Sequence, residues 1–148
     1  MKDCRHLRLT GTIRLPVPAA RAFPLFTPSG ERAWVEDWDP IFHAAVEDET
    51  EPGTVFETNH GGTHTIWVVV RRDEGVMIEY ARITPGDRAG LVRVACESAN
   101  DDETLVTVSY ELTALKPEAN AALDDFAENY GEFLEHWRRL IRRRLSNG

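Results

Sequence analysis

Residues 118–145, EANAALDDFAENYGEFLEHWRRLIRRRL, decide the architecture of this chain. Their apolar positions recur at intervals of three and four, which is the spacing of one face of an α-helix. This apolar stripe consists of Leu123, Phe126, Tyr130, Phe133, Leu134, Trp137, Leu140, Ile141 and Leu145. At about 1.5 Å per residue, a continuous helix of this length spans roughly 40 Å. The sequence therefore predicts one long amphipathic C-terminal helix with an apolar face to cover.

The chain before this helix alternates apolar and polar residues, which is the pattern of half-buried strands. A first strand is predicted over residues 6–15, and Pro16 and Pro18 end it because proline lacks the amide hydrogen that a sheet requires. Two short helices are predicted next, over residues 19–26 and 28–34. Six further strands are predicted over residues 42–49, 54–60, 64–72, 76–84, 91–98 and 104–114. The links between these strands are short and contain turn residues, so neighbouring strands are expected to be antiparallel.

This order of elements predicts an α+β fold in which a curved seven-stranded antiparallel sheet surrounds a long C-terminal helix. Residues 1–148 are expected to form a single domain, because 148 residues fit one core of ordinary size. The apolar face of such a sheet must be covered, and only the predicted C-terminal helix is long enough to cover it. A sheet that curves around a helix leaves space between the two, and concave apolar spaces commonly bind small molecules.

Composition and charge exclude several classes of protein. The chain has 17 Lys and Arg residues against 25 Asp and Glu residues, which gives a net charge of -8. This charge repels nucleic-acid backbones, so no nucleic-acid partner is expected. The longest apolar run, residues 66–70, is far shorter than the roughly 20 residues of a membrane-spanning helix. The N-terminus lacks the apolar core of a secretory signal, so the expected location is cytoplasmic.

The segment PAARAFPLFTPSGERAW, residues 18–34, and the following Trp38-Asp39-Pro40 are similar to the START-like, or SRPBCC, superfamily. The resemblance covers nearly the whole chain and also rests on its length and its order of elements. It implies the helix-grip fold of the birch-pollen allergen, lipid-transfer domains and polyketide aromatase/cyclases. The superfamily includes binders of hydrophobic ligands, cyclases and co-chaperone-like proteins, and it has no universal catalytic motif to carry over.

Alternation along the strands predicts which side chains face the helix. The predicted inward-facing set is Val106, Val108, Tyr110, Leu112, Val92, Val94, Cys96, Ile78, Tyr80 and Arg82. Three strand glutamates, Glu57, Glu79 and Glu111, fall on the opposite face, where solvent exposure is expected.

The predicted ligand-binding residues combine this inward face with the helix stripe. They are His43, Tyr80, Arg82, Val94, Tyr110, Phe126, Tyr130 and Trp137. Arg82 lies near a strand end, where it either closes the mouth of a cavity, binds a carboxylate ligand or is simply solvated. The two strand tyrosines either offer hydroxyl groups to a ligand or are core residues. His43 is either a polar anchor at the cavity or a structural histidine.

No metal or cofactor is expected. His60 and His64 flank Gly61-Gly62-Thr63, and only a three-residue loop would place the two imidazoles across from each other. Even then, a zinc site would need a third ligand such as His43. Cys4 and Cys96 have neither zinc nor redox spacing.

Three hypotheses about function follow. The first is binding of a small hydrophobic or amphipathic molecule between the sheet and the C-terminal helix. The second is a cyclase or dehydratase-like enzyme that uses Tyr, Arg and His groups of the cavity, although no recognisable catalytic motif is present. The third is a co-chaperone-like interaction module with an exposed apolar patch. A homodimer formed through an edge strand is a further possibility.

Overall fold

A computed structural model describes residues 3–147 and contains one six-stranded antiparallel sheet. The strands follow the order β1-β6-β5-β4-β3-β2 across the sheet, so only the step from β1 to β6 joins strands that are distant in sequence. Their bounds are β1 His6–Leu15, β2 Val55–His60, β3 Thr63–Asp73, β4 Met77–Thr84, β5 Arg88–Asn100 and β6 Glu103–Ala114. The predicted α+β fold with a C-terminal helix against an antiparallel sheet is therefore confirmed.

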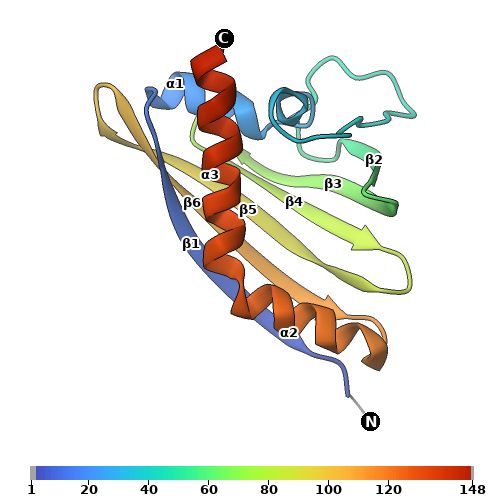
Figure 1. Cartoon of the computed structure of the whole chain (residues 1–148). Coiled ribbons are helices and arrows are strands. Elements are labelled where there is room, and N and C mark those ends of the chain that lie inside the picture. The colour runs from blue at the N-terminus through green and yellow to red at the C-terminus, as the bar shows by residue number, and fades with distance from the viewer. Residues whose placement is uncertain (1–2, 148) are drawn as a thin grey trace.

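The helical segments gather on one face of the sheet (Figure 1). Between β1 and β2 lie α1 Ala19–Ala22 and two 3-10 segments, η1 Phe23–Phe26 and η2 Gly30–Ala33. After β6 come η3 Pro117–Ala119, α2 Asn120–Glu128 and α3 Tyr130–Asn147. Helix α3 crosses the concave face of the sheet and ends near α1 (Figure 1). No helix within residues 3–147 has both the length and the hydropathy to span a membrane.

The C-terminal helix is divided at Asn129, whereas the sequence predicted one continuous helix. Asn129 has φ -106° and ψ 17°, outside the helical region. Its side-chain amide donates a 3.0 Å hydrogen bond to the carbonyl of Asp125, the same carbonyl that accepts the Asn129 backbone N–H. An asparagine that bonds to backbone in this way competes with regular helix geometry. The spacing of the apolar residues in the stripe is unchanged by this hydrogen bond, so it did not predict the break at Asn129.

The strand predicted over residues 42–49 is wrong, and the sheet has six strands instead of seven. Only Ile41 forms a bridge to β2, opposite Glu57. The residues that follow, 42–49, are mostly exposed. Asp48 accepts hydrogen bonds from the backbone N–H and the hydroxyl of Thr50 and pairs with Arg72 at 2.5 Å. These contacts hold a loop, because an aspartate that caps its own backbone favours a turn.

The predicted inward face of the sheet is confirmed for its apolar members. In β6, Val106 and Val108 are fully buried, and in β4, Ile78 is fully buried and Tyr80 is 3% exposed. Helix α3 approaches β1 closely at Gly11, where a Cβ atom would lie 2.5 Å from a methyl carbon of Leu134. Glycine at this position therefore sets how closely the helix and the sheet pack.

Candidate ligand-binding cavity

A partly enclosed cavity of about 200 Å³ lies between the concave face of the sheet, α3 and the segment around η1 and η2. Side chains from β2, β3, β4, β5 and β6 form its floor, and α3 and the η1–η2 region cover it. The lining residues are Phe26, Glu31, Val35, Trp38, His60, Trp67, Tyr80, Arg82, Val92, Val94, Tyr110, Phe133 and Trp137. The space predicted between sheet and helix is therefore present.

Aromatic rings form most of the walls. On the helix side, Phe26 stacks on Trp137 with centroids 6.3 Å apart. On the sheet side, Trp67 meets Trp38 at 5.7 Å and Tyr80 at 5.8 Å, both edge to face. Edge-to-face pairs fix the ring orientations. The cavity therefore has rigid flat walls suited to a flat apolar group.

Tyr80 connects the floor of the cavity to its cover. Its hydroxyl donates a 2.8 Å hydrogen bond to the backbone carbonyl of Phe26 in η1. Burial raises the pKa of Tyr80 well above its usual value, and the charges of Glu31 and Glu49 raise it further. The Tyr80 hydroxyl is therefore already used in a hydrogen bond within the protein, and its ring is the part that lines the cavity.

Glu31 brings an acidic group to the cavity from a tightly turned segment. A Cβ atom on the preceding Gly30 would lie 1.7 Å from the carbonyl oxygen of Pro24, so only glycine fits there. Thr27 holds the turn, because its hydroxyl accepts from the Gly30 N–H at 3.0 Å and its carbonyl accepts from the Glu31 N–H at 3.2 Å. Burial raises the pKa of Glu31 well above its usual value. The environment thus favours the neutral acid, which can donate a hydrogen bond.

Arg82 brings a half-buried cation to the same cavity. Its guanidinium carbon lies 5.4 Å from the centroid of the Trp67 ring, and one terminal nitrogen donates to the Thr84 hydroxyl at 2.8 Å. Its Nε atom is buried and has no hydrogen-bond partner within residues 3–147. Burial lowers the pKa of Arg82, but arginine remains protonated in proteins. The cavity therefore contains a fixed positive charge with a free donor.

Tyr110 lies close enough to Arg82 and Glu31 for both residues to affect the pKa of its hydroxyl. Burial is the main cause that raises the pKa of its hydroxyl, Arg82 opposes the shift, and Glu31 adds to it. Its ring packs edge to face against Phe133 at 5.8 Å and Tyr130 at 6.0 Å. The phenol therefore stays protonated near neutral pH and is held by packing.

The structure brings five of the eight predicted ligand-binding residues to the cavity: Tyr80, Arg82, Val94, Tyr110 and Trp137. Phe126 and Tyr130 pack behind Tyr110, and the Tyr130 hydroxyl donates a 2.6 Å hydrogen bond to the backbone carbonyl of Val108. His43 lies elsewhere, bonded through Nε2 to Glu57 near β2.

Glu31, Trp38, His60 and Trp67 are among the lining residues that the sequence did not predict. Trp67 pairs with Arg82 in the β3–β4 register, so extending the inward face by one strand would have found it. His60 follows the inward-facing Phe56 and Thr58 in β2 by the same alternation. Glu31 and Trp38 lie outside the strands, where no periodicity marks the face that a side chain occupies.

The glycine pair between β2 and β3 separates the two nearby histidines. Gly61 and Gly62 both have positive φ and form a two-residue loop, with His60 opposite Thr63. His60 thus lines the cavity, whereas His64 bonds to Glu57 outside it. Within the described part of the chain, no group of three or more His, Cys, Asp or Glu residues is arranged to hold a metal ion.

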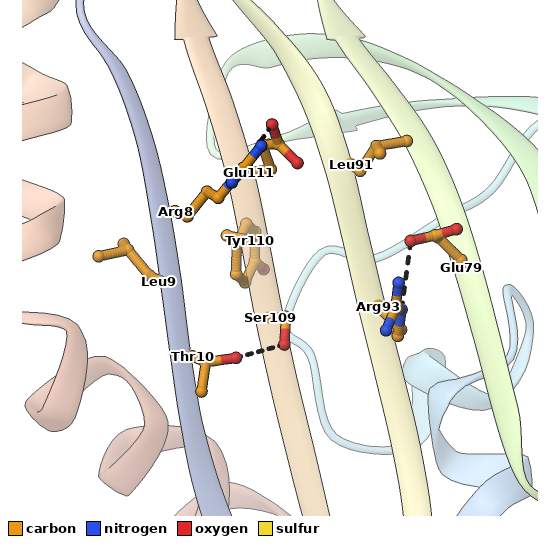
Figure 2. Close-up of a pocket in the computed structure, with 9 residues that line it drawn as sticks. All are labelled: Arg8, Leu9, Thr10, Glu79, Leu91, Arg93, Ser109, Tyr110 and Glu111. Carbon is orange, nitrogen blue, oxygen red and sulfur yellow. Dashed lines mark hydrogen bonds and ion pairs between the residues drawn. The ribbon is translucent and has the colours of Figure 1, made fainter.

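A second hollow, of about 260 Å³, lies on the convex face of the sheet (Figure 2). Its polar groups already pair with each other: Arg93 with Glu79 at 3.3 Å, Arg8 with Glu111 at 3.2 Å, and Thr10 with Ser109. Glu79 was expected to be exposed, but it is only 6% exposed because the side chains of Arg93 and Arg71 cover it. Since its groups are satisfied, this hollow offers a ligand fewer free partners than the cavity under α3.

The fold and cavity together define a helix-grip protein with an internal pocket. The sequence matches the model of the family "Polyketide cyclase / dehydrase and lipid transport" over residues 6–142, so the chain belongs to this family. Among the curated proteins, none matches the chain.

Several solved structures share the fold. An uncharacterised protein from Rhizobium leguminosarum has a TM-score of 0.70 at 19% identity, with 98% of this chain and 97% of that chain covered. A START superfamily protein from Mycobacterium smegmatis has a TM-score of 0.68 at 15% identity, with 97% and 99% covered. An aromatase/cyclase from Streptomyces sp. R1128 has a TM-score of 0.66 at 13% identity, with 95% and 96% covered.

Proposed function

We propose that this protein binds a small amphipathic molecule with a flat apolar group in the cavity under α3. The observation that carries the proposal is an aromatic-walled cavity of about 200 Å³ that also contains Arg82 and Glu31. Elsewhere, an apolar protein cavity of roughly 150 Å³ accommodates benzene, whereas drug-sized ligands need about 300–1,000 Å³. The volume therefore favours a single ring with a short substituent. The family description, which includes lipid transport, is consistent with this class of activity.

Native mass spectrometry tests the binding function directly. Protein purified from its host cells is expected to carry a mass increment that disappears on denaturation, and solvent extraction then yields the molecule for identification. A Trp137→Ala variant, which removes one aromatic wall, is expected to lose the increment. Retention of the increment by this variant, or failure of both the purified protein and a panel of single-ring compounds to show binding, would contradict the proposal.

The second candidate is an enzyme that moves protons on a bound ring or chain. Glu31, Tyr110 and Arg82 lie in one cavity, so an acid and a cation are available to the same small molecule. A carboxyl group with a raised pKa is suited to general acid catalysis near neutral pH, and a nearby guanidinium stabilises a developing oxyanion. The fold shared with an aromatase/cyclase is consistent with such chemistry.

The enzyme candidate depends on a protonated Glu31, which can be detected by measuring the stability of the protein against pH. Its pKa is raised in the folded state from a reference value of 4.5. Below about pH 4.5 the acid is protonated in both states, and stability falls as the pH rises through the folded pKa because only the unfolded state releases the proton easily. Each unit of raised pKa corresponds to about 1.4 kcal/mol.

Glutamine does not ionise, so Glu31→Gln removes the loss of stability with rising pH. The stability of the variant is expected to match that of the wild type near pH 4.5 and to exceed it increasingly as the pH rises. Thermal melts across this range measure the difference. Glu36→Gln, at an exposed position nearby, is the control and should give a constant difference. Parallel curves for Glu31→Gln and wild type would show that Glu31 ionises freely.

A further inference from the structure

We propose that the natural ligand is a small aromatic carboxylate whose anionic group pairs with Arg82 while its ring lies between the cavity tryptophans. This inference rests on the proposed binding function and names the chemical class of the ligand. Its basis is the position, the hydrogen bonding and the charge of Arg82.

Arg82 is a cation without an anionic partner. It makes no ion pair within 4.0 Å anywhere in residues 3–147, and its buried Nε atom donates to nothing there. Asp87, the carboxylate whose charge acts on Arg82, makes its ion pair with Arg88 instead, at 2.6 Å. A half-buried guanidinium without a counterion in contact loses part of its hydration without a compensating ion pair, so an anionic ligand would stabilise it.

Glu31 does not supply the missing counterion. It forms no ion pair with Arg82 in the described chain, although both line the cavity. Burial also favours the neutral form of its carboxyl group. In that form Glu31 complements a hydroxyl or carbonyl oxygen on the ligand, and it leaves the positive charge of Arg82 uncompensated.

The guanidinium is held in place for recognition. Thr84 accepts a hydrogen bond from one terminal nitrogen, and its hydroxyl also bonds to the Thr65 hydroxyl at 2.9 Å. The guanidinium carbon also lies over the Trp67 ring, within cation–π distance of its centroid. A carboxylate can therefore pair with the guanidinium group without having to order the arginine side chain, which favours selective binding.

Arg82 also marks the end of the cavity that an anion would occupy. It lines both the internal cavity and an open polar hollow formed with Thr63, Pro85 and Arg88. Its neighbours in the cavity, by contrast, include Trp38 and Trp67. A ligand with its carboxylate at Arg82 would thus have its charged end toward solvent and its ring inside.

The test compares two ligands of nearly identical shape, phenylacetate and phenylacetamide, by calorimetric titration at pH 7. Wild-type protein is expected to bind the carboxylate about tenfold tighter or more, as a charge-assisted hydrogen bond allows. Arg82→Met keeps the length of the side chain and removes the charge, so it should bring the two affinities within about twofold while the amide still binds. Arg88→Met, which changes a neighbouring cation paired with Asp87, is the control and should keep most of the preference.

The outcomes separate this inference from the function on which it rests. Equal binding of both ligands by wild type, or a carboxylate preference that survives in Arg82→Met, would overturn the role of Arg82 and leave ligand binding in place. Failure of both ligands to bind wild type would count against the single-ring cavity itself. If Arg82→Met does not fold, Arg82→Lys provides the comparison, because it keeps the charge but loses the Nε donor and should lose part of the preference.

Discussion

Phe26→Ala is expected to destabilise the protein by about 3–5 kcal/mol, the range for removing a large buried aromatic side chain. Phe26 is 1% exposed and packs against both Trp34, at 5.9 Å, and Trp137, at 6.3 Å. Its backbone carbonyl also accepts the hydrogen bond from Tyr80. The truncation therefore leaves a void where η1, α3 and the sheet meet.

Urea unfolding followed by far-UV circular dichroism measures this loss. The matched control is Leu25→Ala, a half-buried neighbour in the same 3-10 segment, which should cost less than half as much because it buries less apolar surface. If Phe26→Ala costs no more than Leu25→Ala, then η1 does not hold α3 against the sheet in the way described.

Strand periodicity predicted the floor of the cavity, and it did so because a strand allows only two orientations for each side chain. Tyr80, Arg82, Val94 and Tyr110 lie on the cavity side as the alternation in β4, β5 and β6 requires. The buried apolar side chains of these strands decide which set of alternate residues faces the cavity, since a shift by one residue would move all of them to the exposed face.

The cover of the cavity could not be predicted in the same way. Glu31 and Trp38 are positioned by individual contacts, such as the 2.7 Å hydrogen bond from the Trp38 indole to the carbonyl of Pro28. Such contacts depend on tertiary structure and leave no repeating pattern in the sequence. The same reason explains the false strand at residues 42–49, where alternation was present but a single aspartate, Asp48, capped a loop.

The family resemblance and the residue pattern contributed different information. Element order and the segment from residues 18 to 34 identified the superfamily, which the family match over residues 6–142 bears out. Neither identified a ligand, because the superfamily shares its fold among unrelated activities. We therefore expect the chemistry of this chain to depend on the particular groups in its cavity, above all Arg82 and Glu31.

Gly90→Ala is expected to cost about 3 kcal/mol or more, at the upper end for an overpacked position. Gly90 lies in β5 opposite Leu112 of β6, and a Cβ atom there would be 1.8 Å from the carbonyl oxygen of Glu111. The clash is with backbone in the middle of the sheet, so no rotation of a side chain can relieve it. The strands would have to separate and weaken the ladder between β5 and β6.

Gly131→Ala provides the matched control, because it adds the same methyl group where nothing lies within 4 Å. Gly131 is in helix α3, where alanine is favoured over glycine by about 1 kcal/mol, so this variant should gain stability.

Gly90 also pairs with Arg82 across β4 and β5. A displaced β5 would therefore disturb the guanidinium, and phenylacetate affinity should fall in Gly90→Ala even under conditions where the variant stays folded. A Gly90→Ala protein as stable as wild type would show that β5 and β6 tolerate a wider spacing.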